Sequence, residues 1–303
     1  MESDSPRAKK KEQEFKTPIL TIEDGREVFK RLERLYDLGA ISYCQYIKAI
    51  SFVLVEFATG LRVSEIARLK AEHVDFENHR IVLSTQLTKE GKLLNLKEGN
   101  KVVFLTREAE TALKFYINEC RDKITSQDGY LFVTNAPTVL DRETKTTLFI
   151  HKIIQKSKKY EAFEANLDFP LLESPDIRFK MSFGRKLFIQ VWQSRAEKLG
   201  VDGYLADAIS RKLTGHAPPS DVHKLHYQNI SGTKMWEYYN KIYYNVSFLT
   251  ERQKELLGLS RPKRSRGSNF PFFGGAYALA PFHGYTQERA LSVNPVEAPL
   301  VWN

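Results

Sequence analysis

The sequence predicts an α+β fold that is mostly α-helical and carries a small antiparallel β-sheet or hairpin. Apolar residues recur at helical spacing along most of the chain. The exception is HRIVLSTQLTKEGK followed by NKVVFLT, two β-branched runs around a glycine-bearing, lysine-rich loop. The 303 residues are 42% hydrophobic and 27% charged, which is typical of a folded protein with an adequate core.

Three helices are expected in the first part of the chain. The first begins at Thr21 and ends at Gly39, and the second, from Ser42 to Ala58, is apolar enough to be the buried centre of a bundle. The third begins near Val63. The positions expected to face the core are Val28, Leu32 and Leu35 in the first helix and Ile66, Ala67 and Leu69 in the third.

Helical patterns return after the β-branched runs, with one short strand-like segment, DGYLFVTN, among them. The further helices are expected at 107–121, 146–160, 179–199, a shorter stretch ending in LTGH, and 234–244. Beyond residue 258 a basic linker leads into a tail rich in Gly, Pro and aromatic residues without periodicity. We therefore expect a flexible basic arm at 1–17, one domain at 18–258, and an irregular tail at 259–303.

Composition and charge narrow the classes of protein. A formal net charge of +9 favours a polyanionic partner, of which nucleic acid is the commonest. The two cysteines, Cys44 and Cys120, cannot form a disulfide framework, and no Cys/His cluster has zinc spacing. The N-terminus has no signal-peptide pattern, and the longest apolar run, 49–58, is too short for a bilayer. We expect no metal and no membrane association. The expected location is cytoplasmic or DNA-associated, nuclear in a eukaryotic or viral host context, and not secreted.

Four features go beyond folding. The apolar helix in FATGLRVSEIARLK stops at Thr59-Gly60, and an arginine, Arg62, opens the next helix. The others are Lys89 in the lysine-rich loop, Gly184-Arg185-Lys186, and GHAPPSDVHKLHY from Gly215 to Tyr227. Each has an ordinary structural explanation: a surface arginine, a solvated lysine, a helix C-cap, or a half-buried tyrosine.

In their order along the chain, these features resemble the active site of the tyrosine recombinase, or phage integrase, family. TGLRVSEI is similar to the first box of the family, with its first catalytic arginine, and TKEGK resembles the lysine loop. FGRKLF resembles the second box, in the variant of integrases from archaeal viruses and plasmids. GHAPPSDVHKLHY resembles the closing box, and the match spans about Thr21 to Tyr244.

The resemblance implies the tyrosine recombinase catalytic-domain fold and a function. The chain is expected to be a site-specific recombinase that cleaves and rejoins DNA through a 3′-phosphotyrosyl intermediate, without metal or other cofactor. The residues that it implies as catalytic are Tyr227, Arg62, Arg185, His216 and Lys89. Supporting or alternative residues are Glu65, Arg178, Ser182, Lys92 and His226.

The expected roles follow from the chemistry. Two guanidiniums suit a transition state that gains charge on its phosphate oxygens, since each can grip two oxygens and stays charged. Lys89 would protonate the leaving 5′-oxygen, and His216 would donate to a phosphate oxygen or help to take the proton of Tyr227. Arg62 is also expected at a helix N-terminus, which favours phosphate. Glu65 would support Arg62, or be only a good first-turn residue.

The sequence departs from the family in its second box. Ser182 stands where the family has His or Lys, so Ser182 takes a weaker part, Lys180 or Lys186 substitutes, or the register differs. In the last case Arg178, in SPDIR, would be the second arginine instead of Arg185. Rival nucleophiles, more typical of packing, are Tyr238, Tyr239, Tyr243 and Tyr244.

The first box also comes too early to leave room for the helical clamp domain of most relatives. The chain is thus expected to be a catalytic-domain-only recombinase or a piece of a longer protein. The implied partners are double-stranded DNA and copies of the chain, as a tetramer on two duplexes. Residues 234–244 would be exchanged between neighbours or would pack within the chain. Two alternatives stay open: a DNA-binding protein of the same fold without catalysis, acting in viral genome packaging or transcription, and a helical interaction protein whose boxes match by chance.

Overall fold

The structure is a computed structural model and describes residues 19–84, 100–121, 129–132, 183–216 and 230–260. The chain divides into two compact units, Met1–Arg261 and Pro262–Asn303, and all described residues belong to the first. Its described part is mostly helical and contains a three-stranded antiparallel sheet, so the predicted fold class is confirmed. None of the described helices is long and apolar enough to cross a membrane.

The three helices expected first are present. Helix α2 (Ile22–Asp37) begins at Thr21 and helix α3 (Tyr43–Thr59) at Ser42, each with a capping box in which side chain and backbone bond reciprocally. Helix α4 (Val63–Ala67) is only five residues long. The predicted inward residues of α2 and α4, together with Leu69, are all buried.

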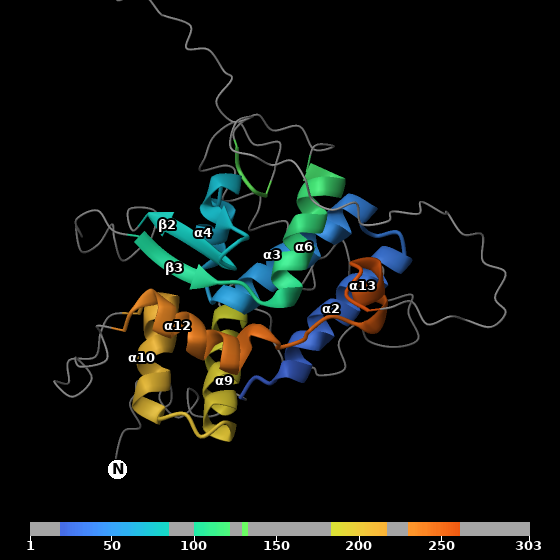
Figure 1. The fold of residues 1–303 in the computed structure, drawn as a ribbon. Coiled ribbons are helices and arrows are strands. Elements are labelled where there is room, and N and C mark those ends of the chain that lie inside the picture. Colours follow the sequence, from blue (N-terminus) through green and yellow to red (C-terminus); the bar gives the residue numbers. More distant parts are fainter. Residues whose placement is uncertain (1–18, 85–99, 122–128, 133–182, 217–229, 261–303) are drawn as a thin grey trace, which may run out of the picture. The chain divides into compact units, whose positions relative to one another are not determined.

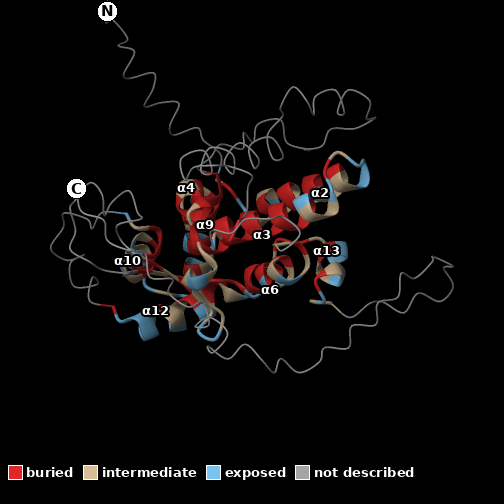
Figure 2. Ribbon diagram, turned by 90° about the horizontal axis from the view of Figure 1, so that it is seen from above, coloured by how far each residue is buried: buried red, intermediate tan, exposed pale blue. Residues whose placement is uncertain are grey.

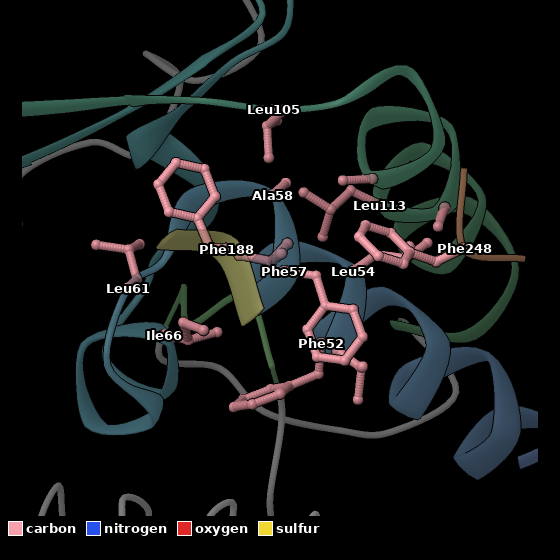
Figure 3. Packing of buried hydrophobic residues seen from close by; sticks show 14 of the residues in the cluster. Phe52, Leu54, Phe57, Ala58, Leu61, Ile66, Leu105, Leu113, Phe188 and Phe248 are labelled. Carbon is pink, nitrogen blue, oxygen red and sulfur yellow. The ribbon is translucent and has the colours of Figure 1, made fainter. Parts of the chain in front are cut away.

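Helix α3 is the centre of the unit. Every residue from Tyr46 to Thr59 is buried, which agrees with its nearly continuous apolar sequence (Figure 2). It packs against α2 and against two helices far along the chain, α6 (Arg107–Tyr116) and α9 (Phe183–Lys198) (Figure 1). Figure 3 shows Phe57 and Ala58 of α3 among apolar side chains that include Leu113 of α6 and Phe188 of α9. The contacts with α2, α6 and α9 therefore fix the position of α3 in the unit.

The sheet has the order β1-β2-β3, with β1 at Val74–Asp75, β2 at Arg80–Ser84 and β3 at Asn100–Phe104. β2 and β3 are antiparallel, and Ser84 lies opposite Asn100. The predicted hairpin is therefore present, and its loop, which contains Lys89 and Lys92, lies outside the described residues.

The remaining described helices follow the prediction with some differences. A π-helical turn, Ile117–Arg121, extends α6 to the predicted end. The later helices are α10 (Gly203–Thr214), α12 (Gly232–Tyr239) with a π-helical turn at Asn240–Tyr244, and α13 (Glu251–Leu256). Helix α13 was not predicted, because its six residues are too few to show a period. The expected helix at 146–160 lies outside the described residues.

One short element differs from the prediction. In the segment DGYLFVTN, the described residues 129–132 do not form a strand, and Tyr130 makes only a single isolated bridge with Lys70. Leu131 and Phe132 are nevertheless fully buried. The apolar run reflects burial beneath α3 and α6, where Phe132 contacts Phe52 and Tyr116, and not strand pairing.

Two of the four rival tyrosines are part of the core. The hydroxyl of Tyr239 donates to the carbonyl oxygen of Ala58 (2.9 Å), and that of Tyr243 donates to the carbonyl oxygen of Phe57 (3.0 Å). Both side chains are fully buried, and burial raises their pKa above the ordinary value for a phenol. Within residues 234–244, Tyr239 and Tyr243 therefore pack against α3 of their own chain.

Candidate functional site

The junction of α3 and α4 presents Arg62. Gly60 ends α3 in the left-handed conformation (φ 62°), and Arg62 is the N-cap residue of α4. The Arg62 side chain is 30% exposed and is thus partly accessible to solvent. Because α4 has only five residues, its macrodipole is small, and the expected contribution of a helix N-terminus to phosphate binding loses its main support.

Glu65 contacts both the backbone and the side chain of Arg62. Its carboxylate accepts the backbone N–H of Arg62 (2.8 Å, Oε2) and lies 3.5 Å from the guanidinium Nη1 through Oε1. The side chain is only 3% exposed. Both expected explanations hold geometrically, since Glu65 closes the first turn of α4 and also pairs with the arginine.

A buried lysine that the sequence analysis did not single out joins Glu65 from the sheet. Lys101, on β3, places its Nζ 3.5 Å from Glu65 Oε2 and donates to the carbonyl oxygen of Thr214 (3.2 Å). Its side chain is 7% exposed. The period-2 pattern carried a signal for it, because Lys101 shares the inward face of β3 with the buried Val103.

Arg185 and His216 meet on the other side of the junction. Arg185 lies in the first turn of α9, and its Nη1 donates to the carbonyl oxygen of Gly60 (3.2 Å). Its Nη2 lies 3.2 Å from Nε2 of His216. The imidazole follows Gly215, which ends α10 in the left-handed conformation (φ 70°), and its Nδ1 lies 2.8 Å from the hydroxyl of Thr214.

These contacts close a ring, which we call the arginine ring. The members of the ring, in order, are Arg62, Glu65, Lys101, Thr214, His216, Arg185 and Gly60, with Leu61 completing the backbone link to Arg62. The members come from the α3–α4 junction, β3, the end of α10 and the start of α9. The structure therefore brings four predicted site residues together in one connected network: Arg62, Glu65, Arg185 and His216.

Gly184, the residue before Arg185, packs directly against the buried carboxyl group of Glu56, which leaves no room for a larger side chain. Glu56 of α3 is almost fully buried and accepts a hydrogen bond from the backbone N–H of Gly184, and burial raises its pKa to about 8. A Cβ on Gly184 would lie only 2.5 Å from Cδ of Glu56. The Gly-Arg pair of FGRKLF thus lets α9 approach α3 closely enough for Arg185 to reach the junction.

Six predicted site residues lie outside the described residues: Tyr227, Lys89, Lys92, Arg178, Ser182 and His226. The same is true of Lys180, whereas Lys186 is half-buried on α9. Both flanks of the segment that contains Tyr227 are anchored to the same helix. His216 follows Gly215, the residue that ends α10, and Lys212 of α10 donates to the carbonyl oxygen of Ile230 (2.9 Å). Within the described ranges, no three His, Cys, Asp or Glu side chains gather as they would around a metal ion.

Comparison with known proteins gives a family match and distant similarity to solved structures. Residues 29–168, just under half of the chain, match the phage integrase family. Among solved structures, a XerA recombinase is similar at 20% identity and a TM-score of 0.39, covering 75% of this chain and 64% of that one, slightly under two thirds. That likeness is too distant to assign residue roles. None of the curated proteins matches.

The matched range contains Arg62, Glu65 and Lys101, and it ends before Arg185 and His216. The first box, the sheet and the buried helix α3 all fall inside it. Over residues 29–168 the chain carries a domain of the phage integrase family, the tyrosine recombinases.

Proposed function

We propose that the chain is a site-specific DNA recombinase that cleaves and rejoins DNA through a 3′-phosphotyrosyl intermediate on Tyr227. The observation that supports this most is the arginine ring, in which Arg185 contacts Gly60, 125 residues earlier, and His216, 31 residues later, and is linked to Arg62 through the other members of the ring. Such a concentration of donors, partly open to solvent at Arg62, suits a phosphate diester. Double-stranded DNA is the proposed partner, bound by copies of the chain as a tetramer on two duplexes.

The two arginines would bind the nonbridging oxygens of the scissile phosphate. Charge on these oxygens increases in the transition state, and one preorganised donor typically contributes about 3 kcal/mol to its stabilisation. The ring preorganises both groups, because Glu65 holds the backbone and guanidinium of Arg62, and the Gly60 carbonyl holds one nitrogen of Arg185.

The proton transfers balance without an additional reactant. The phenolic proton of Tyr227 passes to Nε2 of His216, and the phenolic oxygen forms a bond to phosphorus. The bond between phosphorus and the 5′-oxygen breaks, and that oxygen takes a proton from Lys89. Rejoining runs these steps in reverse, since the phosphotyrosyl bond conserves the energy of the diester. A phenol with a pKa of about 10 needs a base at neutral pH, which is the part given to His216.

A nicked duplex that loses its short 5′-hydroxyl fragment on cleavage tests the proposal, because it traps the covalent intermediate. We expect a protein–DNA adduct that resists SDS and forms in the presence of EDTA. Tyr227→Phe should abolish the adduct, whereas Tyr238→Phe, on a half-buried rival tyrosine, should leave it. Absence of any adduct with salt-dependent DNA binding retained would instead support a DNA-binding protein without catalysis.

A further inference from the structure

Thr214 is the residue at which the two halves of the arginine ring meet. Its carbonyl oxygen accepts from Lys101, which leads to Glu65 and Arg62. Its hydroxyl contacts Nδ1 of His216, which leads to Arg185. The residue is completely buried at the end of α10. Resemblance to the family did not single it out, because it lies in the helix before the Gly-His pair.

The hydroxyl of Thr214 has one proton, and its contacts decide where that proton goes. The oxygen lies 2.7 Å from the carbonyl oxygen of Ser210, an ordinary O–H···O distance. A carbonyl oxygen can only accept, so the hydroxyl donates to it. Nδ1 of His216, 2.8 Å from the same hydroxyl oxygen, must then carry a proton and donate to that oxygen.

The other ring nitrogen gives the same answer independently. Nε2 of His216 lies 3.2 Å from Nη2 of Arg185. A guanidinium has only donors, so a hydrogen bond requires an unprotonated Nε2 with its lone pair directed at the arginine. Both contacts therefore describe a neutral imidazole that is protonated on Nδ1 and has a lone pair on Nε2.

We propose that Thr214 is a positioning residue that holds His216 in this tautomer and so keeps Nε2 as the proton acceptor for the attacking tyrosine. The catalytic part rests on the proposed function, whereas the tautomer is a property of the chain alone. In the proposed reaction, Nη2 of Arg185 binds the phosphate while Nη1 stays on the Gly60 carbonyl oxygen, so that Nε2 of His216 accepts from the phenolic hydroxyl instead.

The side-chain chemistry supplies a matched set of variants. Thr214→Val keeps the branched shape next to Gly60 and removes the hydroxyl, whereas Thr214→Ser keeps the hydroxyl and removes the methyl group. Thr111→Val is the control, because the hydroxyl of Thr111 also donates to the carbonyl four residues earlier in a helix and contacts no imidazole in the described structure. A loss of helix stability alone would appear in both valine variants.

The experiment is ¹⁵N NMR of the histidine imidazoles in the full chain, recorded from about pH 5 to about pH 9 so that the neutral forms are included. The seven histidines are few enough to assign His216 by comparison with His216→Gln. At the alkaline end we expect Nδ1 of His216 to be the protonated nitrogen in the wild type, Thr214→Ser and Thr111→Val. In Thr214→Val we expect the proton to move to Nε2.

Adduct formation on the nicked duplex gives the second readout. We expect Thr214→Val to form the adduct at least about tenfold more slowly, part of the ~100- to 10,000-fold that a positioned acid or base supplies, and Thr214→Ser to recover most of the rate. An imidazole protonated on Nε2 in the wild type, or unchanged in Thr214→Val, overturns the inference even if the adduct forms. A tautomer switch in a chain that forms no adduct contradicts only the proposed function.

Discussion

A single residue, Glu65, shows how the arginine ring is held. One buried carboxylate faces a partly exposed arginine and a buried lysine, Lys101. Burying a charge costs free energy unless it is paired. Because Lys101 is buried and Arg62 is partly exposed, the lysine needs the Glu65 carboxylate more than the arginine does. Removing one partner leaves the other without compensation in a region that excludes water.

Glu65→Gln should therefore destabilise the chain although the change is isosteric. We expect a loss of about 3 kcal/mol in the free energy of unfolding, the lower end for a broken buried pair, because the Thr214 carbonyl still accepts from Lys101. Urea denaturation measures it. Glu72→Gln is the control, since Glu72 pairs with Lys70 at the surface and is 70% exposed.

A second substitution distinguishes the pair from other effects of the glutamine. Lys101→Met in the Glu65→Gln background removes the uncompensated charge and should recover a large part of the lost stability. If the double variant is less stable than Glu65→Gln by the full cost of Lys101→Met alone, the two residues are not coupled and the explanation fails.

The elements meet most tightly at the end of α3. Gly60 has a positive φ of 62°, and a Cβ there would lie 2.8 Å from both Phe188 Cδ1 of α9 and Thr214 Cγ2 of α10. The glycine therefore serves two purposes: it ends α3, and it lets two helices approach the turn that leads to Arg62. Gly39 ends α2 with a similar φ of 67° and has no atom within 4 Å of the same position.

The two glycines separate backbone strain from packing. We expect Gly39→Ala to lose about 1 kcal/mol of stability from the left-handed backbone alone. Gly60→Ala should lose about 2–4 kcal/mol, since overpacking adds about 1–3 kcal/mol to the strain. Thermal and urea unfolding of both variants measures the difference. Equal losses of stability would show that α9 and α10 move apart to accept the methyl group at no cost in free energy.

The sequence predicts helices correctly where a long apolar periodicity or a capping residue marks them. It does not show whether a short buried segment pairs as a strand. The boundaries of α2 and α3 follow from capping residues and from Gly39 and Gly60. The apolar run around Phe132 predicts a strand that the described residues 129–132 do not form, because a short buried segment has the same composition whether or not it pairs.

The candidate site was likewise predictable only in part, where a local sequence motif marks the residue. Resemblance to the family selected Arg62, Arg185 and His216, which the structure joins. The alternation along β3 predicts that Lys101 faces inward, but its contacts with Glu65 and Thr214 depend on how β3 packs against α4 and α10, which no local pattern contains.

At the scale of the whole unit, a buried acid couples stability to pH. Glu56 lies in the central helix, and burial raises its pKa from 4.5 to about 8. The unfolded chain gives up this proton near its ordinary pKa, whereas the folded chain keeps it to higher pH. The stabilising effect is complete below the unfolded pKa and is lost as pH rises through about 8.

Glu56→Gln should remove that dependence, because the amide stays neutral and still accepts from Gly184. Between about pH 5 and about pH 8, the stability of the wild type relative to the variant should fall by about 1.4 kcal/mol for each pH unit at most, a few kcal/mol in total. Urea denaturation across this range tests it, and a parallel profile for the two proteins contradicts the assignment.

The hydrogen bonds at the end of α3 have an electrostatic consequence for any anion held there. The last carbonyl oxygens of a long helix carry a partial negative charge, which repels phosphate. Here the Phe57 and Ala58 oxygens are covered by two enclosed phenols, and the Gly60 oxygen by a guanidinium. The aromatic residues of α12 and its π-helical turn thereby mask a repulsive pole, and an anion approaching Arg62 meets cations in its place.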